Sequence, residues 1–96
     1  MDQPGLRPGA IVRSLAGRDL GSCYVVVRVV DERFVTVANG RRRPVARPKQ
    51  KNRRHLEVLG WADASLALRL ERGAKVTDEE IVKALETIPA RVCEEV

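Results

Sequence analysis

The first sixty residues consist of short apolar runs separated by turn residues, a pattern typical of a small β-rich domain. The clearest run, residues 23–30 (CYVVVRVV), is dense in β-branched side chains and predicts a strand. An outward-facing Arg28 would place Val25, Val27 and Val29 inward, but a bulge could break this alternation, so the register stays open. Further strands are predicted at residues 10–15, 34–38, 42–46 and 55–59.

Glycine, asparagine and proline mark the connections between these strands. Gly17 to Gly21 form a tight connection between the first two strands. Asn39 and Gly40 predict a two-residue hairpin turn, because both turn positions need a positive φ. The next strand carries a proline, which suits an edge position, and residues 48–54 are expected to form a basic loop. Five short strands joined by tight turns predict a closed or nearly closed β-barrel.

Helices are predicted after residue 60. Asp63 can cap a helix over residues 64–72, although alternating leucines keep a strand possible there. Thr77 and Glu80 form a capping box for a second helix. Since this last third has too few apolar residues to fold alone, we expect it to pack on the strands or on a partner. The apolar face of the second helix would consist of Ile81, Val82, Leu85 and Ile88.

The chain has the length of one domain, and its 44% hydrophobic residues fit a globular fold. We expect a flexible lead-in over residues 1–8, a barrel over residues 9–60 and a helical extension over residues 61–96. The lead-in has no apolar core, so no signal peptide is expected, and no apolar run approaches the about 20 residues that cross a membrane. A cytoplasmic protein is therefore expected.

Cys23 and Cys93 lie far apart in the chain and form no CxxC pair, which excludes a zinc ribbon. The favoured interpretation is two reduced thiols in the cytosol. A bridge between them would require secretion, which nothing in the sequence indicates.

The basic charge of the chain is concentrated in one short segment. The chain has 18 Lys and Arg against 13 Asp and Glu, a net charge of +5. Residues 41–54 contain no acidic residue, and without them the chain would be slightly acidic. A local cluster of this kind usually meets a polyanion, although a solvated face or contact with an acidic protein or membrane surface are the alternatives. The cluster consists of Arg41, Arg42, Arg43, Arg47, Lys49, Lys51, Arg53 and Arg54.

Catalytic and metal chemistry lack the residues they would need. His55 is the single histidine, with no acidic or cysteine partner at metal-ligand spacing, and a structural hydrogen bond or a phosphate contact suits it better. No nucleophilic triad, P-loop or dinucleotide fingerprint is present. No catalytic residue, metal, cofactor or small-molecule substrate is therefore expected. Aromatic residues make up only 3% of the chain, so Trp61 is expected to pack at the junction of barrel and helices rather than stack on a base.

Three segments together resemble the KOW motif. Residues 9–30 read GAIVRSLAGRDLGSCYVVVRVV, residues 35–40 read VTVANG and residues 47–56 read RPKQKNRRHL. This combination is similar to small bacterial KOW-domain proteins related to archaeal and eukaryotic large-subunit ribosomal proteins. The resemblance implies an SH3-like barrel that binds structured RNA, often ribosomal. It places Gly21 at the KOW glycine and Arg18 at the basic residue before it.

The residues and the resemblance predict a non-catalytic RNA-binding protein that acts in translation or ribosome assembly. It would dock on structured RNA, ribosomal RNA of the large subunit above all, through a basic hairpin and loop. The alternative is a protein-interaction module that uses the barrel and the second helix. The residues predicted to face RNA are Arg18, Arg41, Arg42, Arg43, Arg47, Lys49, Lys51, Arg53, Arg54 and His55, and those predicted to shape turns are Gly17, Gly21, Asn39 and Gly40.

Overall fold

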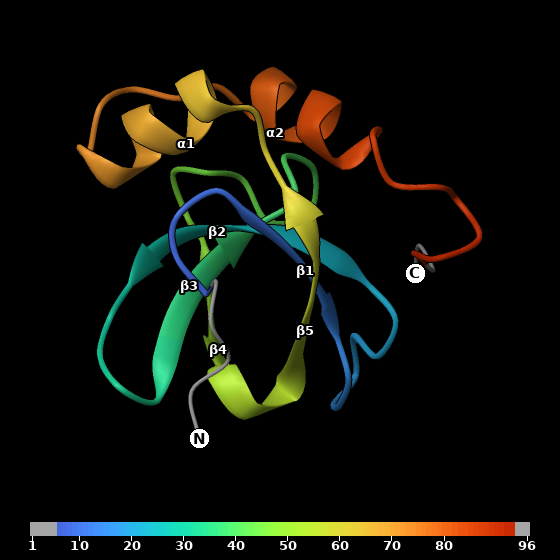
Figure 1. Ribbon diagram of the computed structural model, residues 1–96. Helices are drawn as coiled ribbons and strands as arrows, with labels where there is room; N and C mark the ends of the chain where they lie inside the picture. Colours follow the sequence, from blue (N-terminus) through green and yellow to red (C-terminus); the bar gives the residue numbers. More distant parts are fainter. Residues whose placement is uncertain (1–5, 94–96) are drawn as a thin grey trace.

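The computed structural model describes residues 6–93 and shows a mainly β domain with two short C-terminal helices (Figure 1). Five strands form one antiparallel sheet in the order β4-β3-β2-β1-β5. The sheet curls into a small SH3-like barrel, and a 3-10 turn, η1, connects its two outer strands. The predicted fold class is confirmed. The elements are β1 Ala10–Ser14, β2 Cys23–Val29, β3 Phe34–Ala38, β4 Lys49–Asn52, η1 Arg53–His55, β5 Leu56–Trp61, α1 Ala64–Glu71 and α2 Asp78–Leu85.

The fourth predicted strand, at residues 42–46, is wrong, and so is the loop expected after it. Asn39 accepts hydrogen bonds on Oδ1 from the backbone N–H groups of Arg41 and Arg43, at 2.9 and 3.0 Å. This side chain therefore holds a turn wider than two residues. Strand β4 begins only at Lys49, directly after Pro48, where backbone N–H groups are again available for pairing with β3.

Strand β2 contains the bulge that the sequence left open. Its register with β3 shifts between Val26 and Arg28. The neighbouring residues Val25 and Val26 are both fully buried, although they point to opposite faces of the sheet. Both faces of β2 are thus covered, which explains why its sequence shows no clear alternation.

Two cores lie on the two sides of the sheet. The helices α1 and α2 lie across one end of the barrel and cover its outer face (Figure 1). The barrel interior holds Leu6, Ala10, Val12, Tyr24, Val26, Val35, Val37 and Leu56. The second core, between sheet and helices, holds Ile11, Val25, Ala62, Leu66, Leu70, Val76 and Ile81. Most of the predicted lead-in lies outside the described residues, but Leu6 belongs to the barrel core.

Both helices begin at the caps that the sequence predicted. Asp63 accepts a hydrogen bond from the backbone N–H of Leu66 at 2.9 Å. Thr77 and Glu80 form the reciprocal capping box at α2. Glu80 also pairs with Arg69 of α1, so one carboxylate ties the two helices together. The Arg69 guanidinium and the Thr77 N–H lower the pKa of Glu80 to about 2.

Within residues 6–93, no helix has the length and apolar character needed to span a membrane.

The prediction of two reduced thiols is wrong, because Cys23 and Cys93 form a disulfide with a Cα–Cα distance of 5.5 Å. Helix α2 packs against β2, and the chain after α2 returns to the place where β2 begins. Arg13 of β1 also holds this returning segment, since its Nη1 donates a hydrogen bond to the carbonyl oxygen of Val92 at 3.2 Å. This pairing depends on the packing of α2, which cysteine spacing does not reveal.

Candidate nucleic-acid interface

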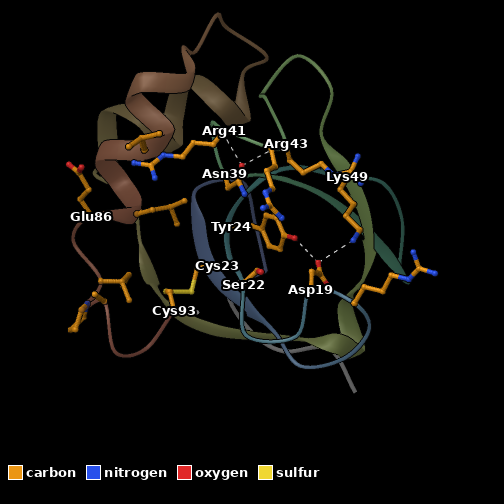
Figure 2. A pocket seen from close by; sticks show the side chains of 17 residues that line it. Asp19, Ser22, Cys23, Tyr24, Asn39, Arg41, Arg43, Lys49, Glu86 and Cys93 are labelled. Atoms are coloured by element: carbon orange, nitrogen blue, oxygen red, sulfur yellow. Dashed lines mark hydrogen bonds and ion pairs between the residues drawn. A yellow bond between two sulfur atoms is a disulfide. The ribbon is translucent and has the colours of Figure 1, made fainter. Parts of the chain in front are cut away.

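A groove of about 940 Å³ lies between the barrel and the segment that follows α2 (Figure 2). Its basic wall consists of Arg18, Arg41, Arg42, Arg43 and Lys49. Its opposite, mostly apolar wall consists of Val82, Leu85, Ile88, Pro89 and Ala90, with Glu86 beside them. Asp19, Ser22, Tyr24, Asn39 and the disulfide complete the lining. We call this feature the basic groove.

The basic wall brings together residues from separate parts of the chain. Arg41, Arg42 and Arg43 project from the turn after β3, while Arg18 comes from the connection between β1 and β2. That connection is a tight turn, as predicted, because Gly21 donates its N–H to the Ser14 carbonyl at 2.8 Å. Its φ of +89° is one that glycine adopts without strain.

Asp19 anchors the turn that carries Arg18. Its Oδ2 accepts hydrogen bonds from the Tyr24 hydroxyl at 2.6 Å and from Lys49 Nζ at 3.2 Å (Figure 2). Its Oδ1 accepts from Ser14 Oγ at 2.9 Å and from Lys51 Nζ at 3.0 Å. The Asp19 side chain is only 13% exposed. A single buried carboxylate thus connects β1, β2, β4 and the turn.

The electrostatics of this network favour a charged Asp19. Burial alone would raise the pKa of Asp19, but hydrogen bonds from Tyr24, Lys51, Ser14 and Lys49 outweigh it and lower the pKa well below its usual value. Burial and the hydrogen bond to Asp19 raise the pKa of Tyr24. The tyrosine therefore remains a neutral donor to an ionised carboxylate.

Lys51 was predicted to face RNA, but it lies inside the protein. It is 7% exposed, and its ammonium also contacts Ser14 Oγ at 3.1 Å and the Ala16 carbonyl oxygen at 3.4 Å. These partners and Asp19 satisfy its charge internally. Lys51 is therefore not part of the exposed basic surface, whereas Lys49, with a side chain 30% exposed, lines the basic groove.

The remaining residues of the basic run lie away from the basic groove. Arg53, Arg54 and His55 form η1, which follows the opposite end of β4 from Lys49. Asn52 caps this turn by accepting the N–H of Arg54 at 2.9 Å. Arg47 is exposed but is not among the residues that line the groove. The run that looks continuous in the sequence is therefore divided between two ends of one strand.

Comparison with known proteins gives a consistent set of relatives. The chain is 29% identical over 82 residues to the large ribosomal subunit protein eL14 of Staphylothermus marinus, which covers 85% of this chain and 78% of the relative. It is 33% identical over 78 residues to eL14 of Aeropyrum pernix, with 81% and 71% covered. The chain belongs to the eL14 family of large ribosomal subunit proteins. No family model matches the chain.

Membership in the eL14 family confirms the predicted relation to large-subunit ribosomal proteins. The family consists of ribosomal proteins, so the expectation that the chain is not an enzyme is also confirmed. In residues 6–93 of this eL14-family chain, no three His, Cys, Asp or Glu side chains are grouped in a way that could hold a metal ion.

Two features of the eL14-family chain were missed from the sequence. The apolar face of the second helix was expected to pack on the strands or on a partner, but Val82, Leu85 and Ile88 also line the basic groove. The amphipathic pattern was the available signal, although it does not show that one edge of the helix faces an opening. Trp61 was expected to pack between barrel and helices; instead it is 46% exposed, with the Arg7 guanidinium 5.3 Å from its ring centroid.

Proposed function

We propose that this chain is a non-catalytic RNA-binding component of the large ribosomal subunit that docks on ribosomal RNA through the basic groove. The observation that carries this proposal is the convergence of four arginines and one lysine on a single groove, in a chain of the eL14 family. Action in the ribosome implies a cytoplasmic location and a role in translation or subunit assembly.

The charges of the basic wall suit phosphate recognition. The side chains of Arg18, Arg42 and Arg43 form no ion pair with any residue in the described part of the chain. A guanidinium presents a planar fork that matches two phosphate oxygens. Because Asp19 fixes the turn that carries Arg18, the backbone at this arginine needs no ordering when RNA binds.

The proposal assigns roles to two of the three predicted regions of the chain. Residues 9–60 form a KOW-type barrel that presents the basic wall. This barrel resembles those of small bacterial KOW-domain proteins. The described part of the predicted helical extension, residues 61–93, supplies the opposite wall. Arg54 and His55, exposed beyond the other end of β4, form a second area of backbone contact together with the neighbouring Arg53, and Arg47 adds an exposed cation just before β4. Lys51 acts only within the protein.

A titration against structured RNA at several salt concentrations tests this function. If about five cations each neutralise one phosphate, log K falls with log salt at a slope of roughly −3.5 to −4.5. Replacing Arg41, Arg42 and Arg43 with alanine should weaken binding and reduce the magnitude of that slope by about 2 to 3. The far-UV circular dichroism of this variant should match that of the parent, because all three residues are exposed.

A matched variant distinguishes binding at the basic groove from nonspecific attraction of RNA to positive charge. Arg28, Arg72 and Lys75 are exposed and lie outside the basic groove, so their triple alanine variant should bind RNA almost as the parent does. In co-sedimentation with large ribosomal subunits, this control variant should bind almost as the parent does, and the Arg41, Arg42 and Arg43 variant should bind more weakly. Equal losses in the two triple variants, or binding that does not change with salt, would contradict a specific role for the groove. Recovery of protein partners only, after nuclease treatment, would favour the protein-interaction alternative.

A further inference from the structure

The two walls of the basic groove differ in chemistry, and RNA backbone alone explains only one of them. A duplex surface presents phosphates and 2′-hydroxyls, which need cations and polar donors. The wall opposite the arginines consists mostly of apolar side chains from α2 and from the segment after it. Figure 2 shows Arg43 and Tyr24 on one side of the opening and Glu86 on the other, with the Arg41 side chain extending from its turn toward the Glu86 side.

A single nucleotide combines the two chemistries that the groove combines. Its phosphate carries the negative charge, and its base has a flat, apolar face. RNA-binding proteins commonly take up bases from loops and bulges, where the base is free to leave the helix. The groove volume of about 940 Å³ lies within the range of pockets that enclose small organic ligands.

We propose that the basic groove takes up one unpaired RNA nucleotide, with its phosphate on Arg42 and Arg43 and its base against Leu85 and Ile88. This inference rests on the proposed RNA-binding function and adds the class of RNA that the groove selects. Polar groups for the base edge are close to the same walls. Ser22 and Asn39 line the groove, and the carboxylate of Glu86 suits an amino group of the base.

The apolar wall is fixed in place before any ligand arrives. The Cys23–Cys93 disulfide fastens the end of the C-terminal segment to β2. The hydrogen bond from Arg13 to the Val92 carbonyl holds the same segment to β1. Ile88 also packs on the core between sheet and helices. A preformed slot of this kind binds its ligand without first paying the entropy of ordering a loop.

Three matched RNA hairpins test the inference by fluorescence anisotropy at one salt concentration. The first has a single unpaired nucleotide in its stem, the second is fully paired, and the third has an abasic site at the unpaired position. The first should bind about tenfold more tightly than the other two, which corresponds to about 1.4 kcal/mol. The abasic hairpin is decisive, since it keeps the extra backbone unit in the stem and removes only the base.

Two variants locate the base on the apolar wall. Ala90 is exposed in the groove, so Ala90→Gln adds polar bulk there without changing the core or the charge. It should abolish the preference for the unpaired nucleotide, so that the three hairpins bind alike. Leu68→Gln, at an exposed leucine of α1 outside the groove, should keep both. Reduction of the disulfide should also diminish the preference, because the wall is then released.

The possible outcomes distinguish a failure of the nucleotide-uptake inference from a failure of the proposed RNA-binding function. Equal binding of all three hairpins, with a steep salt dependence, would overturn this inference and leave the proposed RNA-binding function standing. A preference that survives in Ala90→Gln would place the base elsewhere and would also overturn the inference. Absence of binding to every hairpin would overturn both proposals.

Discussion

Among the carboxylates of residues 6–93, Asp19 is expected to contribute the most to stability. Replacing it with asparagine removes the negative charge and leaves the Lys51 ammonium, 7% exposed, without a counter-charge. Loss of one partner from a buried ion pair costs about 3–5 kcal/mol. The pairing with Lys49 adds little, because that side chain is 30% exposed and reaches water. The loss is large against the total of about 5–15 kcal/mol typical of a domain.

Thermal and urea unfolding measure this cost. For a domain of this size each 1 kcal/mol shifts Tm by about 4–8 °C, so Asp19→Asn should lower Tm by about 12 °C or more. Replacing Lys51 with methionine in the Asp19→Asn background should recover part of the loss, since it removes the uncompensated ammonium and keeps an apolar stem. Lys51→Met alone should leave RNA affinity almost unchanged, because Lys51 does not face the groove.

The same carboxylate gives the stability a defined pH dependence. The pKa of Asp19 is lower in the folded protein than in the unfolded chain, where it lies near 3.9. Its contribution is therefore fully present above that value and is lost as the pH falls through the folded pKa. The parent should lose stability below about pH 4, and the Asp19→Asn variant should lose less over the same range. A variant that costs under about 1 kcal/mol, or a double variant without recovery, would show that Lys51 is not buried against Asp19.

Further measurements test the disulfide and the turn after β3. Cys93→Ala opens a loop that spans 70 residues and should lower the free energy of unfolding by about 4 kcal/mol. Reduction of the parent should lower its Tm about as much as this substitution does. Equal Tm values with and without reductant would contradict the bridge. Gly40→Ala should destabilise more than Gly73→Ala, since both glycines have positive φ but only a Cβ at Gly40 would lie 2.5 Å from the Asp78 carbonyl oxygen. Similar chemical denaturation curves for the two glycine variants would show that the turn and α2 are not in close contact.

The sequence alone determined the elements whose signals are local. Short apolar runs between turn residues indicated the positions of β1, β2, β3 and β5, because strand preference depends on the residues within each run. Asp63 and the Thr77–Glu80 capping box gave the beginnings of both helices, since a cap acts on the next three residues. The excess of positive charge was equally evident from composition.

Only the tertiary structure decided which of these charges act together. Arg18 lies on the same groove as the arginines after β3 because β2 pairs with both β1 and β3. No sequence pattern shows that these segments are close in space. Lys51 turns inward because Asp19, far from it in the chain, lies beside β4 and offers a buried counter-charge. The disulfide likewise depends on where α2 returns the chain. The sign of a charge follows from the residue type, whereas the burial of that charge and its ion-pair partners depend on how the whole domain packs.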